Sequence, residues 1–328
     1  MNRTNKNVIG WSGLAILIAL FPFLGIQGYT VQILTLAGIY GIVALGLNLV
    51  LGSAGQISLG QAAFFGIGAY TSSQLMIKFG LSFWLALPLG GLLSGLVGLG
   101  LGYLALRFHG HYLAMVTLSF GLILQIFFME FSMLTGGAGG LADIPSARLM
   151  GQIIENSSQA VIKTFHLVWF FLLILLWMLN NLISSRTGRA LASLRDNPIA
   201  AQMSGIPIAR YKVQAFTLAA VLAGFAGALY SVHTRYIGPE IFGVGASLEF
   251  LIMVVIGGLG HPLGAVSGAI LLAVLPEFMR AYEEYRLLFF GLMLMIIVVA
   301  APGGIFGLLQ SWFKWLTTFR QDSLEKAP

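Results

Sequence analysis

Residues 46–70 read GLNLVLGSAGQISLGQAAFFGIGAY, and in this stretch two apolar runs meet at a polar, glycine-rich break. The runs on either side cover about residues 31–51 and 60–78. A helix that crosses a bilayer needs about 20 mostly apolar residues, so each run is long enough to span a membrane. Irregular backbone at membrane depth is tolerated only where it faces protein or a water-filled cavity. The stretch therefore predicts two membrane helices with a protein-lined or water-lined interruption between them.

The same composition extends over the whole chain. Of its 328 residues, 58% are hydrophobic and 9% are charged, and the mean hydropathy is +0.91. Soluble domains carry about 25% charged residues, so we expect an all-α membrane helix bundle that forms a single domain over residues 1–328. Its length predicts about 8 to 10 transmembrane helices, some with glycine-rich interruptions. The candidate spans are residues 8–26, 31–51, 60–78, 82–106, 111–131, 165–184, 213–235, 247–260, 262–280 and 286–303.

The placement of Lys and Arg predicts the orientation, because cytoplasmic loops carry an excess of these residues. With ten spans and a cytoplasmic start, eleven of the 17 basic residues fall on the cytoplasmic side. This topology places both termini in the cytoplasm and predicts an external loop at 132–164, a cytoplasmic loop at 185–212 and a cytoplasmic tail at 304–328. The formal charge of +6 is then explained by the basic residues that orient the chain in the lipid bilayer. We therefore expect no nucleic-acid partner.

Glycine accounts for 42 residues, and several pairs are four positions apart. Helices in lipid associate by close packing over such small residues, so we expect these pairs to lie where helices of this chain touch. The pairs are Gly91 with Gly95, Gly98 with Gly102, and Gly264 with Gly268.

A weak internal repeat links residues 50–60 (VLGSAGQISLG) to residues 255–264 (VIGGLGHPLG). Both segments lie between consecutive apolar runs. Interrupted segments at corresponding positions of two halves are typical of transporters, in which the pathway runs near the breaks. Chance similarity between glycine-rich segments explains the repeat nearly as well. The two segments also share one orientation in the predicted topology, whereas many importers contain inverted repeats.

The loop at 185–212 contains the signals of a short helix at about 198–204. Asp196 or Asn197 suits the N-cap, Pro198 suits the first helical position, and Gly205 suits the left-handed position after the helix. The apolar residues of this helix need a surface to pack on, either the underside of the bundle or another protein. They are Ile199, Ala200, Ala201 and Met203.

The sequence lacks the motifs of a catalytic protein. No GxxxxGK[ST] motif is present, so the 328 residues contain no P-loop that could cradle ATP phosphates. Cysteine is absent and the five histidines are scattered, which leaves no pattern for a metal or nucleophilic site. We expect no catalytic residue, no metal and no directly bound cofactor.

Several further motifs follow residues 46–70 in order. They are HYLAMVTL at 111–118, LTGG at 134–137, TGRAL at 187–191, the loop at 200–205, AGFAGALY at 223–230 and the segment 254–264. Taken together, these motifs resemble those of the LivM-type permeases of high-affinity branched-chain amino acid ABC importers, over about residues 35–307. One departure is Gln61, where many members of that family carry histidine.

The resemblance implies a permease subunit of an ATP-driven importer for branched-chain amino acids in a bacterial inner membrane. Its implied partners are a homologous, LivH-like second permease, two ABC ATPase subunits that hydrolyse the ATP, and an external or periplasmic substrate-binding protein. In that family the segment at 188–212 docks on an ATPase subunit. The residues expected to couple to the ATPase are Arg189, Arg195, Asp196, Pro198, Ile199, Ala200, Ala201, Met203 and Gly205.

The resemblance leaves the identity of the cargo open, because relatives also carry urea, amides or other small polar or aromatic acids. A zwitterion needs a weakly polar route that replaces water without holding the cargo tightly. Uncharged residues near the first break and on a later span are candidates, although interhelical hydrogen bonds are their commoner role. They are Asn48, Gln56, Ser58, Gln61, Thr117, Ser119 and Gln125.

An ion-coupled secondary transporter is a less favoured alternative, and an intramembrane enzyme is another. A secondary transporter is expected to bury a coupling carboxylate within the membrane. The eleven Asp and Glu residues fall in loops or near the ends of the predicted spans, with Glu130, Glu249 and Glu277 closest to the interior. The scattered histidines and the lack of paired catalytic residues disfavour an enzyme.

Overall fold

The computed structural model describes residues 28–105, 107–108, 110–149, 152–153 and 158–278, together with isolated positions between 288 and 307. The predicted spans at 8–26 and 286–303 and the predicted tail at 304–328 lie outside the described residues, apart from those isolated positions. Each of the eight remaining predicted spans can be compared with a helix.

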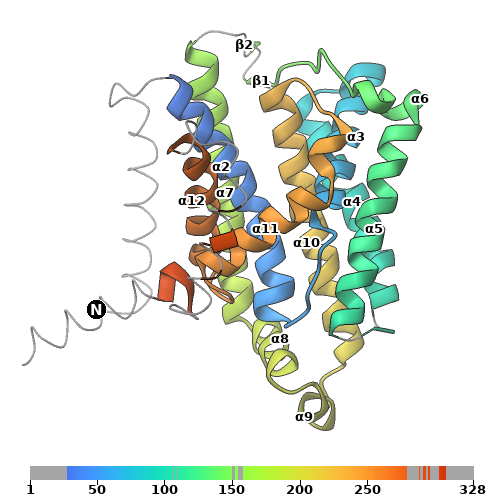
Figure 1. Cartoon of the computed structure of the whole chain (residues 1–328), viewed down its shortest axis with the longest axis vertical. Coiled ribbons are helices and arrows are strands. Elements are labelled where there is room, and N and C mark those ends of the chain that lie inside the picture. Colours follow the sequence, from blue (N-terminus) through green and yellow to red (C-terminus); the bar gives the residue numbers. More distant parts are fainter. Residues whose placement is uncertain are drawn as a thin grey trace, which may run out of the picture.

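All eight of these spans correspond to helices, which pack as one bundle (Figure 1) and confirm the all-α prediction. The long helices are α2 (Gly28–Asn48), α3 (Gln61–Phe79), α4 (Phe83–Ala105), α5 (His111–Glu130), α7 (Ser158–Ser184), α10 (Ile208–Thr234), α11 (Val244–Gly257) and α12 (Pro262–Phe278). In the described part, the strands are two short ones, β1 (Arg148–Leu149) and β2 (Gln152–Ile153), which pair antiparallel.

Short helical segments lie at the two ends of the bundle or interrupt the long helices. The π-helical turn η2 (Leu49–Ser53) continues directly from α2, and the 3-10 turn η4 (Pro239–Phe242) precedes α11. The others are α6 (Ser132–Thr135), η3 (Gly137–Gly139), α8 (Arg186–Asp196) and α9 (Pro198–Met203). Helices α8 and α9 lie at one end of the bundle, and the β1–β2 hairpin lies at the other (Figure 1).

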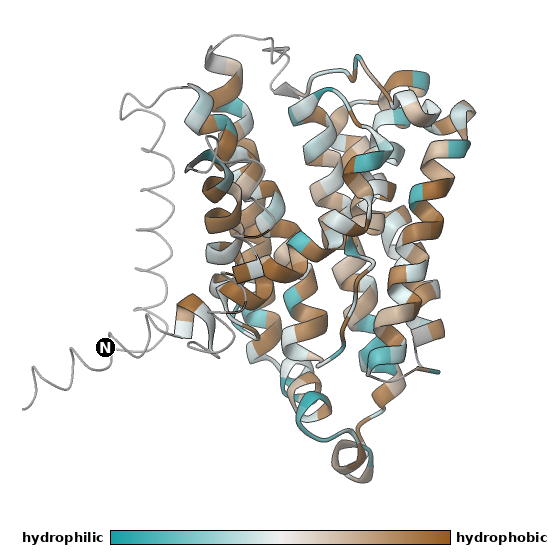
Figure 2. Cartoon of the chain, in the orientation of Figure 1, coloured by the Kyte–Doolittle hydropathy of each residue, from teal (hydrophilic) through white to brown (hydrophobic). Residues whose placement is uncertain are grey.

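The surface of the bundle is that of a membrane protein. Five helices in the described part are long and apolar enough to cross a bilayer: α2 with η2, α4, α5, α7 and α10. Large apolar side chains such as Leu96, Ile123 and Phe170 are exposed on these helices. Hydrophilic residues gather at the bundle ends and on α8 (Figure 2). In water so large an exposed apolar surface would drive aggregation, whereas lipid accommodates it.

Helix α10 forms the centre of the bundle and packs against α2, α3 and α4. The predicted glycine pairs lie at these contacts: Gly91, Gly95, Gly98 and Gly102 of α4 all face α10, and Gly264 and Gly268 of α12 face α11. Ser94 links three helices, because its Oγ lies 2.8 Å from the Ala220 carbonyl of α10 and 3.1 Å from the Phe64 carbonyl of α3. The prediction that these glycines pack helices within the chain is confirmed.

Two loops are shorter than the sequence suggested. Helix α7 begins at Ser158 instead of near 165, so the loop predicted at 132–164 ends at 157. The first turns of α7 contain the polar residues Lys163, Thr164 and His166. These residues are helical but not apolar, so the apolar run begins later than the helix. Helix α10 likewise begins at Ile208, so the loop predicted at 185–212 ends at 207.

Replacing Gly68 with alanine tests the close packing of α3 against α10. A Cβ at Gly68 would overlap the carbonyl oxygen and Cα of Gly224. We expect Gly68→Ala to destabilise the purified protein by about 1–3 kcal/mol, because rigid backbone must move apart. Thermal unfolding in detergent measures the change. Gly100→Ala on α4 is the control, because no heavy atom lies within 4 Å of a Cβ there; equal destabilisation of both variants would contradict the packing argument.

Candidate functional site

Helix α9 forms as the capping signals predicted. The Asn197 Oδ1 accepts hydrogen bonds from the backbone N–H groups of Ile199 and Ala200, each at 3.1 Å, and Pro198 occupies the first turn. Gly205 has a φ of +79°, the left-handed conformation expected after the helix. Asp196 is the last residue of α8 and not the cap. Since only Asn197 separates the two helices, α8 and α9 form a continuous elbow at the end of the bundle.

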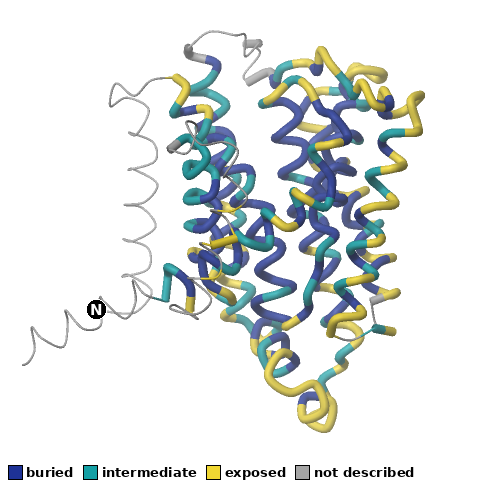
Figure 3. Tube along the Cα trace, viewed as in Figure 1, coloured by how far each residue is buried: buried dark blue, intermediate teal, exposed yellow. Residues whose placement is uncertain are grey.

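The apolar residues of α9 do not share one face, and this corrects the predicted docking set. Ala201 is 3% exposed and packs toward the bundle, whereas Ile199 is 75% exposed and Met203 is 86% exposed. Residues four positions apart lie on the same side of a helix, while Ala201 lies two positions from each and so faces the opposite side. Helix α9 is the outermost element at this end and is largely exposed (Figure 3).

Arg195 extends from α8 to the first glycine-rich break. Its Nη1 donates a hydrogen bond to the carbonyl oxygen of Gly52 in η2, at 2.8 Å. Its aliphatic stem covers Gly55, where a Cβ would lie 2.7 Å from the Arg195 Cγ. Gly55 has a φ of +66°, so a side chain there would also strain the backbone. The salt bridge from Arg195 to Asp196 is solvent-exposed and adds little stability.

The two segments of the weak internal repeat meet in space. The Asn48 Oδ1 accepts a hydrogen bond from the backbone N–H of Gly260, at 2.9 Å. A Cβ on Gly52 would overlap both the Asn48 Oδ1 and the Gly260 nitrogen. We call the group formed by Asn48, Gly52, Gly55 and Gly260 the glycine junction. Arg195 lies over it, because its Nη1 would be 3.3 Å from a Cβ on Gly260.

Helix α3 begins inside the bundle, after the irregular segment at 54–60. The backbone N–H of Leu59 donates to the Thr117 Oγ1 of α5 at 2.9 Å, and that of Ala62 donates to the Ser247 Oγ of α11 at 3.1 Å. The Gln61 Nε2 donates to the carbonyl of Ala219, which is the twelfth of 27 residues in α10. The N-terminal ends of α3 and α11 therefore meet near the middle of α10.

The predicted pathway residues separate into groups. Asn48, Gln61 and Thr117 make hydrogen bonds within the chain, as described above, and Gln125 faces the backbone of Gly243 at the start of α11. Ser119 is exposed on α5, away from the break. In the part of the chain that the structure describes, a third group has buried polar side-chain atoms without a hydrogen-bond partner close to the break. These atoms are the Gln56 Oε1 and Nε2 and the Ser58 Oγ. The Ser53 Oγ, which the sequence analysis did not single out, is likewise buried without a hydrogen-bond partner.

An aromatic cluster that the sequence did not reveal lies against the N-terminal half of α3. Phe242 of η4 has its ring centroid 5.5 Å from Phe65, 5.5 Å from Tyr70 and 6.0 Å from Phe128. Phe242 is fully buried, and the Tyr70 hydroxyl is buried without a hydrogen-bond partner. These four residues come from α3, α5 and η4, so no local spacing in the sequence could have grouped them.

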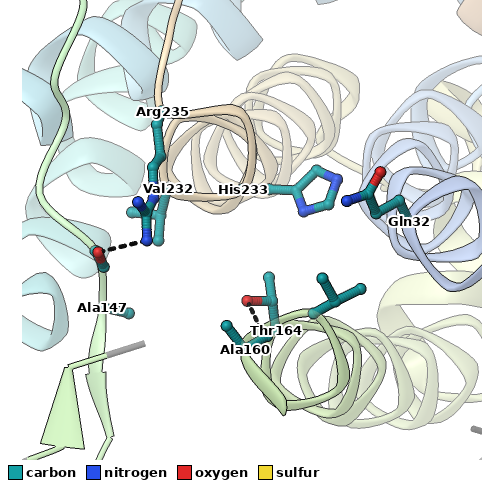
Figure 4. Close-up of a pocket in the computed structure, with 9 residues that line it drawn as sticks. Gln32, Ala147, Ala160, Thr164, Val232, His233 and Arg235 are labelled. Carbon is teal, nitrogen blue, oxygen red and sulfur yellow. Dashed lines mark hydrogen bonds between the residues drawn. The ribbon is translucent and has the colours of Figure 1, made fainter. Parts of the chain in front are cut away.

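A cavity of about 80 Å³ lies near the hairpin end, between α2, α7 and α10. His233 of α10 and Arg235, the residue after α10, line it together with Gln32 of α2, and His233 points toward Gln32 (Figure 4). The Arg235 Nη2 donates to the Ser146 Oγ at 2.8 Å. These groups fix the loop before β1 to the end of α10.

A larger cavity, of about 390 Å³, corrects the predicted position of Glu249. Glu249 is the sixth residue of α11 and lines this cavity with Tyr40 of α2 and Glu277 of α12. Because α11 begins at Val244 and not at 247, Glu249 lies in the second turn of this helix and not at the end of the span. The Tyr29 hydroxyl donates to the Glu277 Oε2 at 2.6 Å.

Residues 29–298 match the family described as the branched-chain amino acid transport system / permease component. The chain belongs to this permease family. LivM of Escherichia coli K12, a high-affinity branched-chain amino acid transport system permease protein, is 35% identical over 321 residues, which cover 92% of this chain and 75% of LivM. LivH of Salmonella typhimurium is 26% identical over 288 residues, covering 83% of this chain and 92% of LivH. No solved structure matches the chain significantly.

Family membership and the apolar helices together identify the protein as a transport component of a membrane. BraD of Pseudomonas aeruginosa, another permease of branched-chain amino acid transport, is 26% identical over 290 residues, or 84% of this chain and 93% of BraD. The glycine junction and the irregular segment at 54–60 both lie within the matched region.

Replacing Asn48 with alanine tests the glycine junction of this permease. The variant removes the acceptor of the partly buried backbone N–H of Gly260, so we expect a loss of about 1 kcal/mol in unfolding free energy. Denaturant or thermal unfolding in detergent measures it. Asn180→Ala is the matched control, because Asn180 is exposed on α7. A similar loss in the control would mean that the effect does not come from the junction.

Proposed function

We propose that this chain is one permease subunit of an ATP-driven importer for branched-chain amino acids, and that residues 1–328 form one domain and half of the translocation pathway. The names of the relatives LivM, LivH and BraD support this cargo. The observation that carries the coupling part of the proposal is helix α9, a capped helix that places Ile199 and Met203 in solvent at the end of the bundle.

The α8–α9 end is assigned to the cytoplasm of a bacterial cell, with the bundle in the inner membrane and both termini on the cytoplasmic side. Basic residues support this orientation, because Arg186, Arg189, Arg195 and Arg210 all lie at or next to α8 and α9. The opposite end, with the β1–β2 hairpin, then faces the outside. An external substrate-binding protein docks there and selects the cargo.

ATP hydrolysis is assigned to two separate ATPase subunits, because the sequence contains no P-loop. Ile199, Met203 and Ala200 dock on one of them, and the buried Ala201 anchors α9 to its own chain. Burying an exposed Ile or Met side chain contributes about 1.5–3 kcal/mol of favourable free energy. Two such residues are therefore enough to hold a short helix on a partner surface. A homologous second permease completes the pathway, and the separate names of LivM and LivH support such a pair.

The pathway is assigned to the segment at 54–60 and its surroundings. A buried polar group without a partner costs about 1–3 kcal/mol, and Gln56 and Ser58 together leave three such atoms beside the break. Opening the break gives these atoms water or cargo to bind. The N-terminal ends of α3 and α11 add partial positive charge near the same place, which suits the carboxylate of an amino acid.

Acidic substitution of the exposed face of α9 tests ATPase docking. We expect Met203→Asp or Ile199→Asp to lower ATP-dependent uptake at least about tenfold, because the charge would be buried against an apolar surface of the partner. Uptake into proteoliposomes and the ATPase rate of the assembled importer measure it. Met203→Leu is the matched control, because it keeps an apolar side chain of similar size at the same exposed position and should leave uptake near the parent value.

Unchanged uptake in both acidic variants would contradict the docking assignment. Collapse of the ion gradients provides a further control on the same preparation. Uptake that follows the gradients and does not need the ATPases would favour the ion-coupled alternative.

Two glutamine substitutions test the pathway. We expect Gln56→Leu to leave stability unchanged or raise it by about 1 kcal/mol, because it removes an unpartnered buried amide, while lowering uptake. Gln61→Leu removes the hydrogen bond to Ala219 and should lower stability by about 1 kcal/mol. Unfolding and uptake are measured on each variant. A Gln56→Leu protein with full uptake would remove this residue from the pathway.

A further inference from the structure

Arg195 joins the α8–α9 elbow to the glycine junction through its hydrogen bond to Gly52, a residue 143 positions earlier in the sequence. We propose that Arg195 is a positioning residue that latches the junction closed, and that displacement of α9 by the ATPases releases it. This inference rests on the proposed function for the source of the displacement. The latch itself is a property of this chain and can be tested separately.

The hydrogen bond from Arg195 to Gly52 is stabilising and can also be broken by exposure to water. The last carbonyl groups of a helix lack intrahelical partners and carry partial negative charge. Gly52 lies in the π-helical turn that ends α2, so the guanidinium of Arg195 both satisfies its carbonyl and complements the dipole of that helix. The donor side chain is about half exposed, so it can leave the junction for water.

The junction is built from backbone that can rearrange. π-Helical turns are rare and frequently mark functional sites. Gly52, Gly55 and Gly260 have no side chains, and Cβ atoms at these positions would meet Asn48 or Arg195. Arg195 therefore contacts both breaks where Gly52 and Gly260 lie against each other. Its removal would leave Asn48 as the side chain that bridges the two breaks through a hydrogen bond.

The closed junction also contains groups that favour opening. The Ser53, Gln56 and Ser58 side chains are buried beside it without hydrogen-bond partners. Each would gain partners on contact with water, so the closed arrangement needs a compensating interaction. The charged hydrogen bond from Arg195 is such an interaction, since hydrogen bonds to ionised groups are the stronger class.

The elbow provides the mechanical connection. Helix α8 ends at Asp196 and α9 begins at Pro198, so Arg195 lies in the last turn of α8, directly before the proposed docking helix. A displacement of α9 reaches this turn through a single residue, Asn197. Arg189, on the same helix, makes a different bond, because its Nη1 donates to the Ser184 carbonyl of α7 at 3.2 Å.

The chain contains no cysteine, so a single introduced thiol can report on the junction. The experiment uses the assembled importer in membranes without nucleotide and places Ser58→Cys in the parent, in Arg195→Gln and in Arg189→Gln. A membrane-impermeant maleimide is added from the α8–α9 side. We expect this chain to label about tenfold faster in Arg195→Gln than in the parent, and no change in Arg189→Gln.

A second reporter separates a latch from a general loss of structure. Ser94→Cys places a thiol among α3, α4 and α10, where Ser94 is fully buried. Faster labelling at position 58 alone supports the latch. Faster labelling at both positions, or an unchanged rate at position 58 in Arg195→Gln, overturns it.

A final measurement separates the latch from the docking proposal. With ATP and the loaded binding protein, the parent should label faster at position 58 than without them, and Met203→Asp should abolish this increase. The faster nucleotide-free labelling of Arg195→Gln should survive in the Met203→Asp background. If ATP has no effect on labelling while Arg195→Gln still accelerates it, the latch stands and the docking role of α9 fails.

Discussion

A chain that interrupts its helices inside a bilayer must still give every buried backbone group a hydrogen-bond partner, because lipid offers none. The segment at 54–60 and the first turn of α3 meet part of this requirement with side chains from other helices. Thr117 of α5 accepts from Leu59, and Ser247 of α11 accepts from Ala62. At the preceding turn, Arg195 of α8 donates to Gly52. The break is thus held by parts of the chain that come much later in the sequence.

This dependence explains why the segment can be both ordered and adjustable. The partners are single side chains on separate helices, so a small displacement of one helix removes one bond and leaves the others in place. The backbone approaches closely at Gly52 and Gly260, which only the absence of side chains permits.

Local rules accounted for most of the fold. Hydropathy located eight described helices, because a spanning helix must be apolar along its length. Cap chemistry located α9, since Asn197, Pro198 and Gly205 each satisfy a requirement at a helix end. The same rules placed the start of α7 too late, because polar residues can continue a helix beyond the apolar run.

The candidate site was only partly predictable, because its important contacts are long-range. Grouping the apolar residues of α9 by type placed Ala201 on the wrong side, and the helical angle between positions 199 and 201 would have corrected it. The sequence suggested the two breaks through a weak repeat, yet nothing in it indicated that Arg195 and Asn48 join them. Glu249 lies further along its helix than expected, because α11 begins at Val244, before the apolar run that marked the predicted span.

The exposed side chains of Ile199 and Met203 also have a consequence before the subunit is assembled into a complex. A newly inserted subunit presents two large apolar side chains to an aqueous compartment, on a helix that is already folded. Chaperones and quality-control proteases recognise such surfaces. If α9 docks on an ATPase subunit as proposed, assembly covers these side chains, whereas an unassembled copy keeps them exposed.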